Sequence, residues 1–393
     1  MKRTIVIVTR NKYPNEDAGA IRQHSIGKIF IDLGYRVFII GNGAYTGFNK
    51  KVYDGIEYVS LRSNTVNKLK RLRDHLMFGK NAMKIINELS NSIFAIVVVD
   101  ILPGAFSTIK KFAIKKNIHL IHDSVEWYSA NEFKSRIFSI DFILKEYTNR
   151  IIIRKEWSVI AISTYLEEYF IRKGCNVIRL PVIMDIKCNK SQHSNVSLKR
   201  KIVYAGGPGR KDYLLEILKG INLLDNNDKK KIEFHIVGVN REQLIKICGV
   251  SQELLEKLNK IVYLHGRVSH EEAIKWIKEA DFSILIRNEK LRYAKAGFPT
   301  KVVESLCWGT PVICNLSSDL NKYLNSYNSI IVEGHKPSDV VKALKKMIKL
   351  NDDNLLLMRK TARNTAEQNF DYRKYIKKLK NFIDHIDNNK EIK

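Results

Sequence analysis

The segment between Phe282 and Asn315 constrains the fold most strongly. An apolar run at Phe282–Ile286 predicts a buried strand, and Thr300–Trp308 has the pattern of a short helix. Gly309 ends that helix, and Val312–Ile313 begins another apolar strand. A strand, a helix and a strand in this order predict a parallel α/β unit.

The start of this helix has the chemistry of an anion site. Gly297 predicts a turn, and Pro299 fits the first helical turn, where its missing N–H costs nothing. Lys301 and Glu304 follow within one turn. Free N–H groups and the helix dipole favour an anion such as a diphosphate, and the carboxylate could hold a ribose. An ordinary strand–helix–strand corner without a ligand is the alternative.

The same segment resembles the nucleotide-sugar signature of glycosyltransferase family 4, retaining enzymes of the glycosyl transferases group 1 type. Glu304 fits the second Glu of that signature, whereas Ala296 stands where the first Glu falls. Some members carry a Pro-Thr-Lys-x-x-Glu version, which this chain matches. The resemblance implies a GT-B fold, in which two Rossmann-like parallel-sheet domains face a cleft. It also implies donor binding by a run of residues here: Gly297, Phe298, Pro299, Thr300, Lys301 and Glu304.

The length of 393 residues suits two or three domains. We expect an N-terminal domain at 1–185, a polar linker at 186–199, a nucleotide-sugar domain at 200–370 and a C-terminal helix at 371–393. The resemblance implies that the last helix crosses back to the first domain.

Bulk composition excludes several classes of protein. The sequence has no apolar stretch near the roughly 18 residues of a membrane span, and its first residues lack the pattern of a signal peptide. Its five cysteines are scattered, which favours reduced cytoplasmic thiols. The net charge of +27 predicts an anionic partner. Nucleic acid is the less suitable partner, because no RNA- or DNA-binding motif accompanies the charge.

The first domain begins with a strand at Thr4–Val8, a helix at Ile21–Leu33 and a strand at Val37–Ile40. Gly19 lies just before the helix. In the resembled family a glycine here approaches the donor diphosphate, which lack of a Cβ allows. A simple loop glycine is the alternative.

Two polar residues, His122 and Asp123, follow the predicted strand His119–Ile121. Ligands of open α/β sheets bind at the carboxyl ends of strands. The resemblance places a functional histidine at this point, so we expect His122 and Asp123 in catalysis. A structural histidine is the alternative.

One or two basic amphipathic helices around Gly79 are predicted at 65–89. Such a helix can lie on an anionic bilayer, or it can be a solvated face over a core. Further lysines gather at 110–116 in the same domain. We expect peripheral binding at the inner face of the cell membrane, with this contact made by a set of basic residues: Lys68, Lys70, Arg71, Arg73, Lys110, Lys111, Lys115 and Lys116.

The second domain opens with a strand at Ile202–Ala205, a glycine-rich turn and a helix at Tyr213–Leu224. Arg210 and Lys211 bring positive charge to that turn, which suits a diphosphate leaving group. In the resembled family an Arg and a Lys serve the phosphates here. Lys211 matches and is expected in catalysis as well as donor binding, and Arg210 takes the place of the Arg. Surface charge on a turn is the alternative.

Three later strand ends contribute further expected donor contacts through Gly238, Val268 and Arg287. No metal-ligand spacing is present, so we expect no metal and no cofactor other than the donor itself. The resemblance implies a retaining glycosyltransferase that moves a sugar from a nucleotide-diphosphate sugar to a lipid-linked glycan in bacterial surface polysaccharide synthesis. A non-catalytic sugar-nucleotide-binding partner and a GT-B sugar-nucleotide epimerase remain alternatives.

Overall fold

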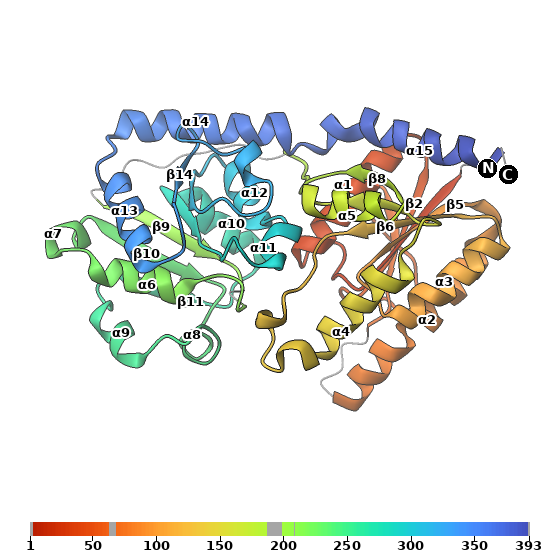
Figure 1. The fold of residues 1–393 in the computed structure, drawn as a ribbon, viewed down its shortest axis with the longest axis horizontal. Coiled ribbons are helices and arrows are strands. Elements are labelled where there is room, and N and C mark those ends of the chain that lie inside the picture. The colour runs from red at the N-terminus through yellow and green to blue at the C-terminus, as the bar shows by residue number, and fades with distance from the viewer. Residues whose placement is uncertain (1–2, 63–67, 187–198, 208, 392–393) are drawn as a thin grey trace. The chain divides into compact units, whose positions relative to one another are not determined.

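The computed structural model describes residues 3–62, 68–186, 199–207 and 209–391 (Figure 1). Nothing is stated for the side chains of 68–72, 75 and 389–391. The predicted linker at 186–199, and Lys68, Lys70 and Arg71 of the predicted basic helix, therefore lie largely outside the described part. The chain divides into two compact units: 1–127 with 137–185 and 371–393, and 128–136 with 186–370.

The first unit contains an eight-stranded sheet in the order β3-β4-β2-β1-β5-β6-β7-β8. Neighbouring strands are parallel except for the antiparallel pair β3–β4. Its strands are β1 Thr4–Thr9, β2 Arg36–Gly41, β3 Lys51–Tyr53, β4 Ile56–Ser60, β5 Ile93–Val99, β6 His119–Ser124, β7 Ser158–Ala161 and β8 Asn176–Arg179. Its longer helices are α1 Ala18–Asp32, α2 Lys68–Leu89, α3 Pro103–Lys115, α4 Ile140–Tyr147, α5 Thr164–Arg172 and α15 Ile376–Glu391.

The core of the first unit forms because β1 and β5 are apolar on both faces. Every residue of Thr4–Thr9 and of Ile93–Val99 is buried, as expected for central parallel strands covered by helices on both sides. Helix α15 contributes Leu379 and Phe382 to this core, although it is the last element of the chain. Packing of α15 therefore returns the chain to the first unit.

The second unit contains a six-stranded parallel sheet in the order β11-β10-β9-β12-β13-β14. Its strands are β9 Arg200–Ala205, β10 Ile232–Val237, β11 Val262–Gly266, β12 Phe282–Leu285, β13 Val312–Cys314 and β14 Ser329–Ile331. Its helices are α6 Leu214–Leu223, α7 Asn226–Lys229, α8 Arg241–Cys248, α9 Gln252–Lys257, α10 His270–Glu279, α11 Arg292–Ala296, α12 Thr300–Cys307, α13 Pro337–Ile348 and α14 Asp352–Asn369.

One segment departs from the domain limits expected from the sequence. Residues 128–136 lie within the expected N-terminal domain, yet they pack with the second unit. The Ser129 hydroxyl accepts a hydrogen bond from the Tyr293 N–H at 3.1 Å, and Arg292 donates from Nε to the Tyr128 carbonyl at 2.9 Å. These hydrogen bonds join residues far apart in the sequence and hold the segment in place. Sequence periodicity does not predict them.

Candidate functional site

The second sheet has a topological switch point between β9 and β12. The chain runs from β9 outward to β11, and then begins again on the other side of β9 with β12. In open parallel sheets, ligands bind outside the carboxyl ends of the strands at such a point. The residues that follow β9 and β12 are therefore the first place to look for a site.

A buried ion-pair network occupies this switch point, with Asp212 at its centre. One carboxylate oxygen accepts from Arg287 Nε at 2.9 Å, and the other accepts from Lys301 Nζ at 2.5 Å. The Tyr204 hydroxyl donates to the second oxygen at 2.7 Å. Burial alone would raise the pKa of Asp212, but the attraction of Lys301 and Arg287 outweighs it and lowers the pKa to about 2. Asp212 is therefore ionised at neutral pH.

Two glycines let the backbone approach this network closely. Gly206 has φ +118, and a Cβ there would lie 2.7 Å from Lys301 Cε. Gly238 has φ +94, and its Cβ would lie 3.1 Å from the Gly206 backbone. A side chain at either position would be strained and would crowd the strand ends. The fold thus requires a glycine at 238 for steric reasons, and its predicted contact with the donor stays a prediction.

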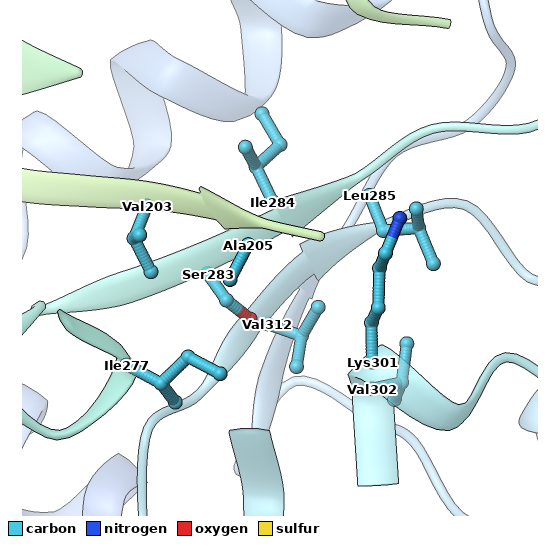
Figure 2. A pocket seen from close by; sticks show the side chains of 9 residues that line it. All are labelled: Val203, Ala205, Ile277, Ser283, Ile284, Leu285, Lys301, Val302 and Val312. Atoms are coloured by element: carbon cyan, nitrogen blue, oxygen red, sulfur yellow. The ribbon is translucent and has the colours of Figure 1, made fainter. Parts of the chain in front are cut away.

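Figure 2 shows Lys301 extending from α12 toward Leu285, beside a small hollow under the sheet. The hollow is about 10 Å³, the size of about one water molecule. Most of its lining is apolar, from Val203, Ile277 and Val312. It is a packing gap between the strand ends and helices α10 and α12, too small for a nucleotide.

Glu304 lies one turn into α12 and is half-buried. Burial raises the pKa of its carboxyl to about 7, against the opposing attraction of Lys301. Among the described residues its carboxylate has no hydrogen-bond or ion-pair partner. A desolvated carboxyl group without a partner is costly for folding alone, so this position favours a ligand that donates hydrogen bonds.

Lys211 lies in the turn that precedes α6. Its Nζ is 3.1 Å from Glu132 Oε2 and 5.1 Å from the centre of the Tyr128 ring. Both partners come from the 128–136 segment described above. Arg210 beside it is exposed. The sequence predicted the cation but gave no sign of Glu132, which is far away along the chain.

The other residues expected to bind the donor have varied surroundings. Arg287 belongs to the Asp212 network, whereas Val268 packs against an apolar cluster that includes Val237 and Ile277. Phe298 is buried against Tyr323 and Phe370. The remaining three lead into or begin α12: Gly297, Pro299 and Thr300.

The first unit holds the other expected site residues. Gly19 lies in the first turn of α1, and a Cβ there would lie 2.2 Å from the Asn11 side-chain nitrogen. Close contact with Asn11 therefore requires a glycine unless the Asn11 side chain moves. Whether Gly19 also approaches a diphosphate stays a prediction.

His122 and Asp123 lie within β6, which extends beyond the predicted strand limit at Ile121. The His122 ring is fully buried beside Phe106 and Phe170, and its Nδ1 is 3.0 Å from the Val98 carbonyl oxygen. Burial lowers the pKa of His122 to about 3, so the ring is neutral. As placed, this side chain belongs to the core, and its predicted catalytic role stays a prediction.

Asp123 is also fully buried, in a closed network. It receives two charged hydrogen bonds from Arg22, at 3.0 Å from Nε and 2.8 Å from Nη2, and one from Gln23 at 2.8 Å. The remaining Arg22 donors bind the carbonyls of Leu180 and Pro181. Arg22 was not singled out from the sequence, because nothing local distinguishes it from other basic residues of the helix.

The switch point of the first sheet lies between β1 and β5. Arg10 follows β1 and donates from Nε to the carbonyl of Asp100, which follows β5, at 2.8 Å. Lys145 of α4 lies 3.6 Å from the Asp100 carboxylate.

A hollow of about 520 Å³ lies next to Arg10, between α2 and α3. Its lining includes Lys80 and Thr108 but is mainly apolar, with Leu76, Phe78, Met83, Leu102 and Ala105. Sequence reasoning missed this hollow, although the strand-end rule would have found Arg10 and Asp100.

Comparisons with known proteins bear on this geometry. Residues 199–350 match the family described as Glycosyl transferases group 1. The uncharacterized glycosyltransferase MJ1069 of Methanocaldococcus jannaschii is 23% identical over 71% of this chain and 70% of its own length. The chain is a glycosyltransferase, and the part that matches the group 1 family is the domain at 199–350.

Solved structures of low sequence identity share the fold of this glycosyltransferase. Sucrose-phosphate synthase of Thermosynechococcus elongatus superposes with a TM-score of 0.76 at 12% identity, covering 98% of this chain and 99% of its own. Alr3699/HepE of Anabaena, in complex with UDP and glucose, gives 0.62 at 13% identity, covering 97% and 99%. The predicted GT-B architecture of two parallel-sheet α/β domains is confirmed.

Proposed function

We propose that this glycosyltransferase transfers a sugar from a nucleotide-diphosphate sugar to a lipid-linked glycan, with retention at the anomeric carbon and without a metal. The observation that carries the donor part is Glu304, a half-buried carboxyl group without a partner among the described residues, beside the cations of the switch point. A ribose donates two hydroxyl hydrogen bonds, which is what such a carboxylate lacks.

The diphosphate is assigned to the positive groups around Glu304. The first turn of α12 presents free N–H groups, and Lys211 and Arg210 lie on the turn after β9. Charge on the diphosphate grows as the sugar departs, so cations held here stabilise the transition state more than the ground state. The UDP bound to Alr3699/HepE supports a nucleoside diphosphate as the leaving group.

The acceptor is assigned to the first unit. The hollow between α2 and α3 has the size of a small-molecule site, and its apolar wall with Arg10 and Lys80 suits a molecule that combines an apolar part with an anionic group. A lipid-linked phosphate or diphosphate glycan has this chemistry. Such acceptors occur in bacterial surface polysaccharide synthesis.

The same acceptor chemistry favours a place at the cytoplasmic face of the membrane. No helix in the described ranges is long and apolar enough to cross a bilayer. With a net charge of +27, attraction to anionic lipids suffices for peripheral, salt-sensitive attachment.

Ligand-induced thermal shifts with a panel of nucleoside diphosphates test the donor assignment. We expect one of them to stabilise the wild-type chain. Glu304→Ala should weaken its binding by about 1 to 3 kcal/mol, the scale of a lost charged hydrogen bond. Glu253→Ala is the matched control, because Glu253 is an exposed glutamate of α9 in the same unit. Equal affinity in all three proteins would remove the assignment of Glu304.

Turnover is tested with the donor selected by that screen. Transfer of labelled sugar to a lipid extract, with retained anomeric configuration, is the expected result. Conversion of the donor to its epimer without an acceptor would identify a sugar-nucleotide epimerase instead.

A further inference from the structure

An exposed apolar stripe begins at Phe138, just before α4, and runs along α4 and the π-helical turn that follows it, η4 (Thr148–Ile152). The exposed fraction is 78% for Phe138 and 72% for Ile140, and close to half for Ile143, Tyr147 and Ile151. Side chains of this size gathered in one place mark an interaction site more often than scattered exposure does. The functions proposed above make no use of this stripe.

The stripe is one face of the helix and cannot turn inward. Ile140, Ile143, Tyr147 and Ile151 recur at helical spacing, so they project from the same side. The opposite side is fixed in the first unit, because Lys145 is buried and lies 3.6 Å from the Asp100 carboxylate. The fold therefore leaves this apolar face in contact with water, which is unfavourable.

Basic groups border the stripe. Arg150 lies beside it and is more than half exposed, and Arg154 and Lys155 follow η4. The basic end of α3 is tied to the same place by the ion pair between Lys110 and Glu156, at 2.6 Å. Exposed Lys111 and Lys115 lie on that helix, which Figure 1 shows in the same unit as α4.

The acidic groups near the stripe do not cancel this charge. Glu146 is engaged, since it accepts from Trp127 Nε1 at 2.7 Å and from Arg150 Nε at 2.6 Å. Asp141 is exposed at the start of α4, where the helix dipole favours a carboxylate. The surroundings of the stripe are net positive.

An anionic bilayer fits this surface better than a second copy of the chain does. In a two-fold dimer the same patch faces itself, which would bring the two sets of basic groups together. A narrow stripe of isoleucines with one Phe and one Tyr, rimmed by cations, is the pattern of a helix that lies in the headgroup region. Aromatic rings are favoured at that depth.

We propose that the α4 stripe inserts into the surface of an anionic membrane and is the main membrane contact of the protein. This inference rests on the proposed lipid-linked acceptor and names the surface that reaches it. It adds an inserting apolar face on α4 to the basic contact expected on α2, because insertion needs an exposed apolar face.

Co-sedimentation of the full chain with vesicles tests the proposal. Vesicles of phosphatidylcholine with phosphatidylglycerol are compared with phosphatidylcholine alone. We expect the wild-type chain to prefer the anionic vesicles and Phe138→Ser/Ile140→Asn to bind them at least about tenfold more weakly. Leu356→Asn/Leu357→Asn is the matched control, because both leucines are about 60% exposed on α14 of the second unit and should not matter. Lys111→Gln/Lys115→Gln should weaken binding at low salt only.

Three outcomes would contradict the proposal. Wild-type binding by the stripe variant would overturn the assignment while leaving membrane association intact. Failure of the wild-type chain to bind any vesicle would overturn it, as would a dimer that the stripe variant dissociates. Nucleoside diphosphate thermal shifts, measured on the same proteins, report separately on folding and on the proposed donor site.

Discussion

Two buried aspartates, Asp123 in the first unit and Asp212 in the second, hold charged networks of opposite kinds. Asp123 is surrounded by Arg22 and Gln23, and backbone carbonyls bind the spare donors of Arg22. Asp212 is bound to Lys301 and Arg287, whose side chains keep 24% and 14% of their surface exposed. The first network is closed on itself, whereas the second keeps two cations partly available to a ligand.

The difference shows that a buried carboxylate paired with cations can serve either stability or ligand binding. A buried carboxylate must be paired, and the pair can be sealed or left open on one side. The open network lies at a switch point, and the closed one does not. We therefore propose that Asp123 stabilises the first unit and that Asp212 holds cations for the proposed donor site, whereas the catalytic role expected for Asp123 stays a prediction.

The largest expected effect is on stability, and it should be similar in both networks. Asp123→Asn and Asp212→Asn each leave buried cations without a counter-ion, so each should lower the free energy of unfolding by about 3 to 5 kcal/mol. Urea unfolding measures this. Asp352→Asn is the control, because the Arg200–Asp352 pair is more than half exposed on the aspartate side and should contribute less than about 1 kcal/mol.

Ligand response should separate the two variants. At a temperature where both are folded, Asp123→Asn should keep the thermal shift produced by a nucleoside diphosphate, whereas Asp212→Asn should lose most of it because Lys301 is no longer held in place. Loss of the shift in both variants would erase the distinction between closed and open networks.

The next effect is on turnover. Lys211→Ala should lower kcat by about 10²- to 10³-fold, with a smaller change in KM, because the cation meets charge that develops as the sugar departs. Lys219→Ala is the matched control, as Lys219 is exposed on α6. Arg210→Ala should have a weaker effect, since Arg210 is exposed. Wild-type kcat in both the Lys211 and Arg210 variants would place the phosphates elsewhere.

The parts of the fold that could be predicted are those determined by residues close together in the sequence. Apolar runs such as Ile93–Val99 could be recognised as buried strands, because a central parallel strand is apolar on both faces. The hairpin of β3 and β4 was missed, although Asp54 and Gly55, both at positive φ, form a favoured two-residue turn between them. Helix α4 was missed because its outer face is apolar where a solvated helix would be polar.

The predictable part of the site is smaller. Lys211, Lys301 and Glu304 could be named as candidates because a helix start or a glycine-rich turn lies next to them in sequence, and their roles stay predictions. Asp212 was missed because its partners Arg287 and Lys301 are 75 and 89 residues away. Pairings across strands depend on the order of the sheet, which sequence periodicity does not specify.

The third effect is a pH dependence at Glu304. Burial raises the pKa of this carboxyl to about 7 in the folded protein, above its ordinary value of 4.5. The neutral form is therefore favoured on folding, and stability present below pH 4.5 is lost as the pH rises through 7. Glu304→Gln should stabilise the protein relative to wild type at pH 8 by about 1 to 3 kcal/mol, toward the lower value because the side chain keeps some contact with water. At pH 4 the two should be equal. A pH-independent difference would show that packing, and not charge, is responsible.

The smallest effect concerns Glu132. It tests whether the cations near the second network are available to a ligand. Glu132 Oε2 lies 3.1 Å from the Lys211 ammonium, so it lies where an anionic group would contact that cation. A diphosphate must compete with Glu132 for Lys211. Glu132→Gln keeps the shape and can keep the hydrogen bond from the Ser129 N–H, which is 2.6 Å long in the wild-type chain, but it removes the charge. It should tighten nucleoside diphosphate binding by about 1 kcal/mol, roughly fivefold.

Calorimetric titration of the wild-type chain, Glu132→Gln and the double variant Glu132→Gln/Lys211→Ala measures this competition. The gain should vanish in the double variant, because the competition requires the Lys211 ammonium group. Weaker binding by Glu132→Gln would reverse the interpretation: Glu132 would then hold Lys211 in its binding position. In that case carboxylates would bind the cations of the donor site on both sides, as backbone carbonyls bind the spare Arg22 donors in the Asp123 network.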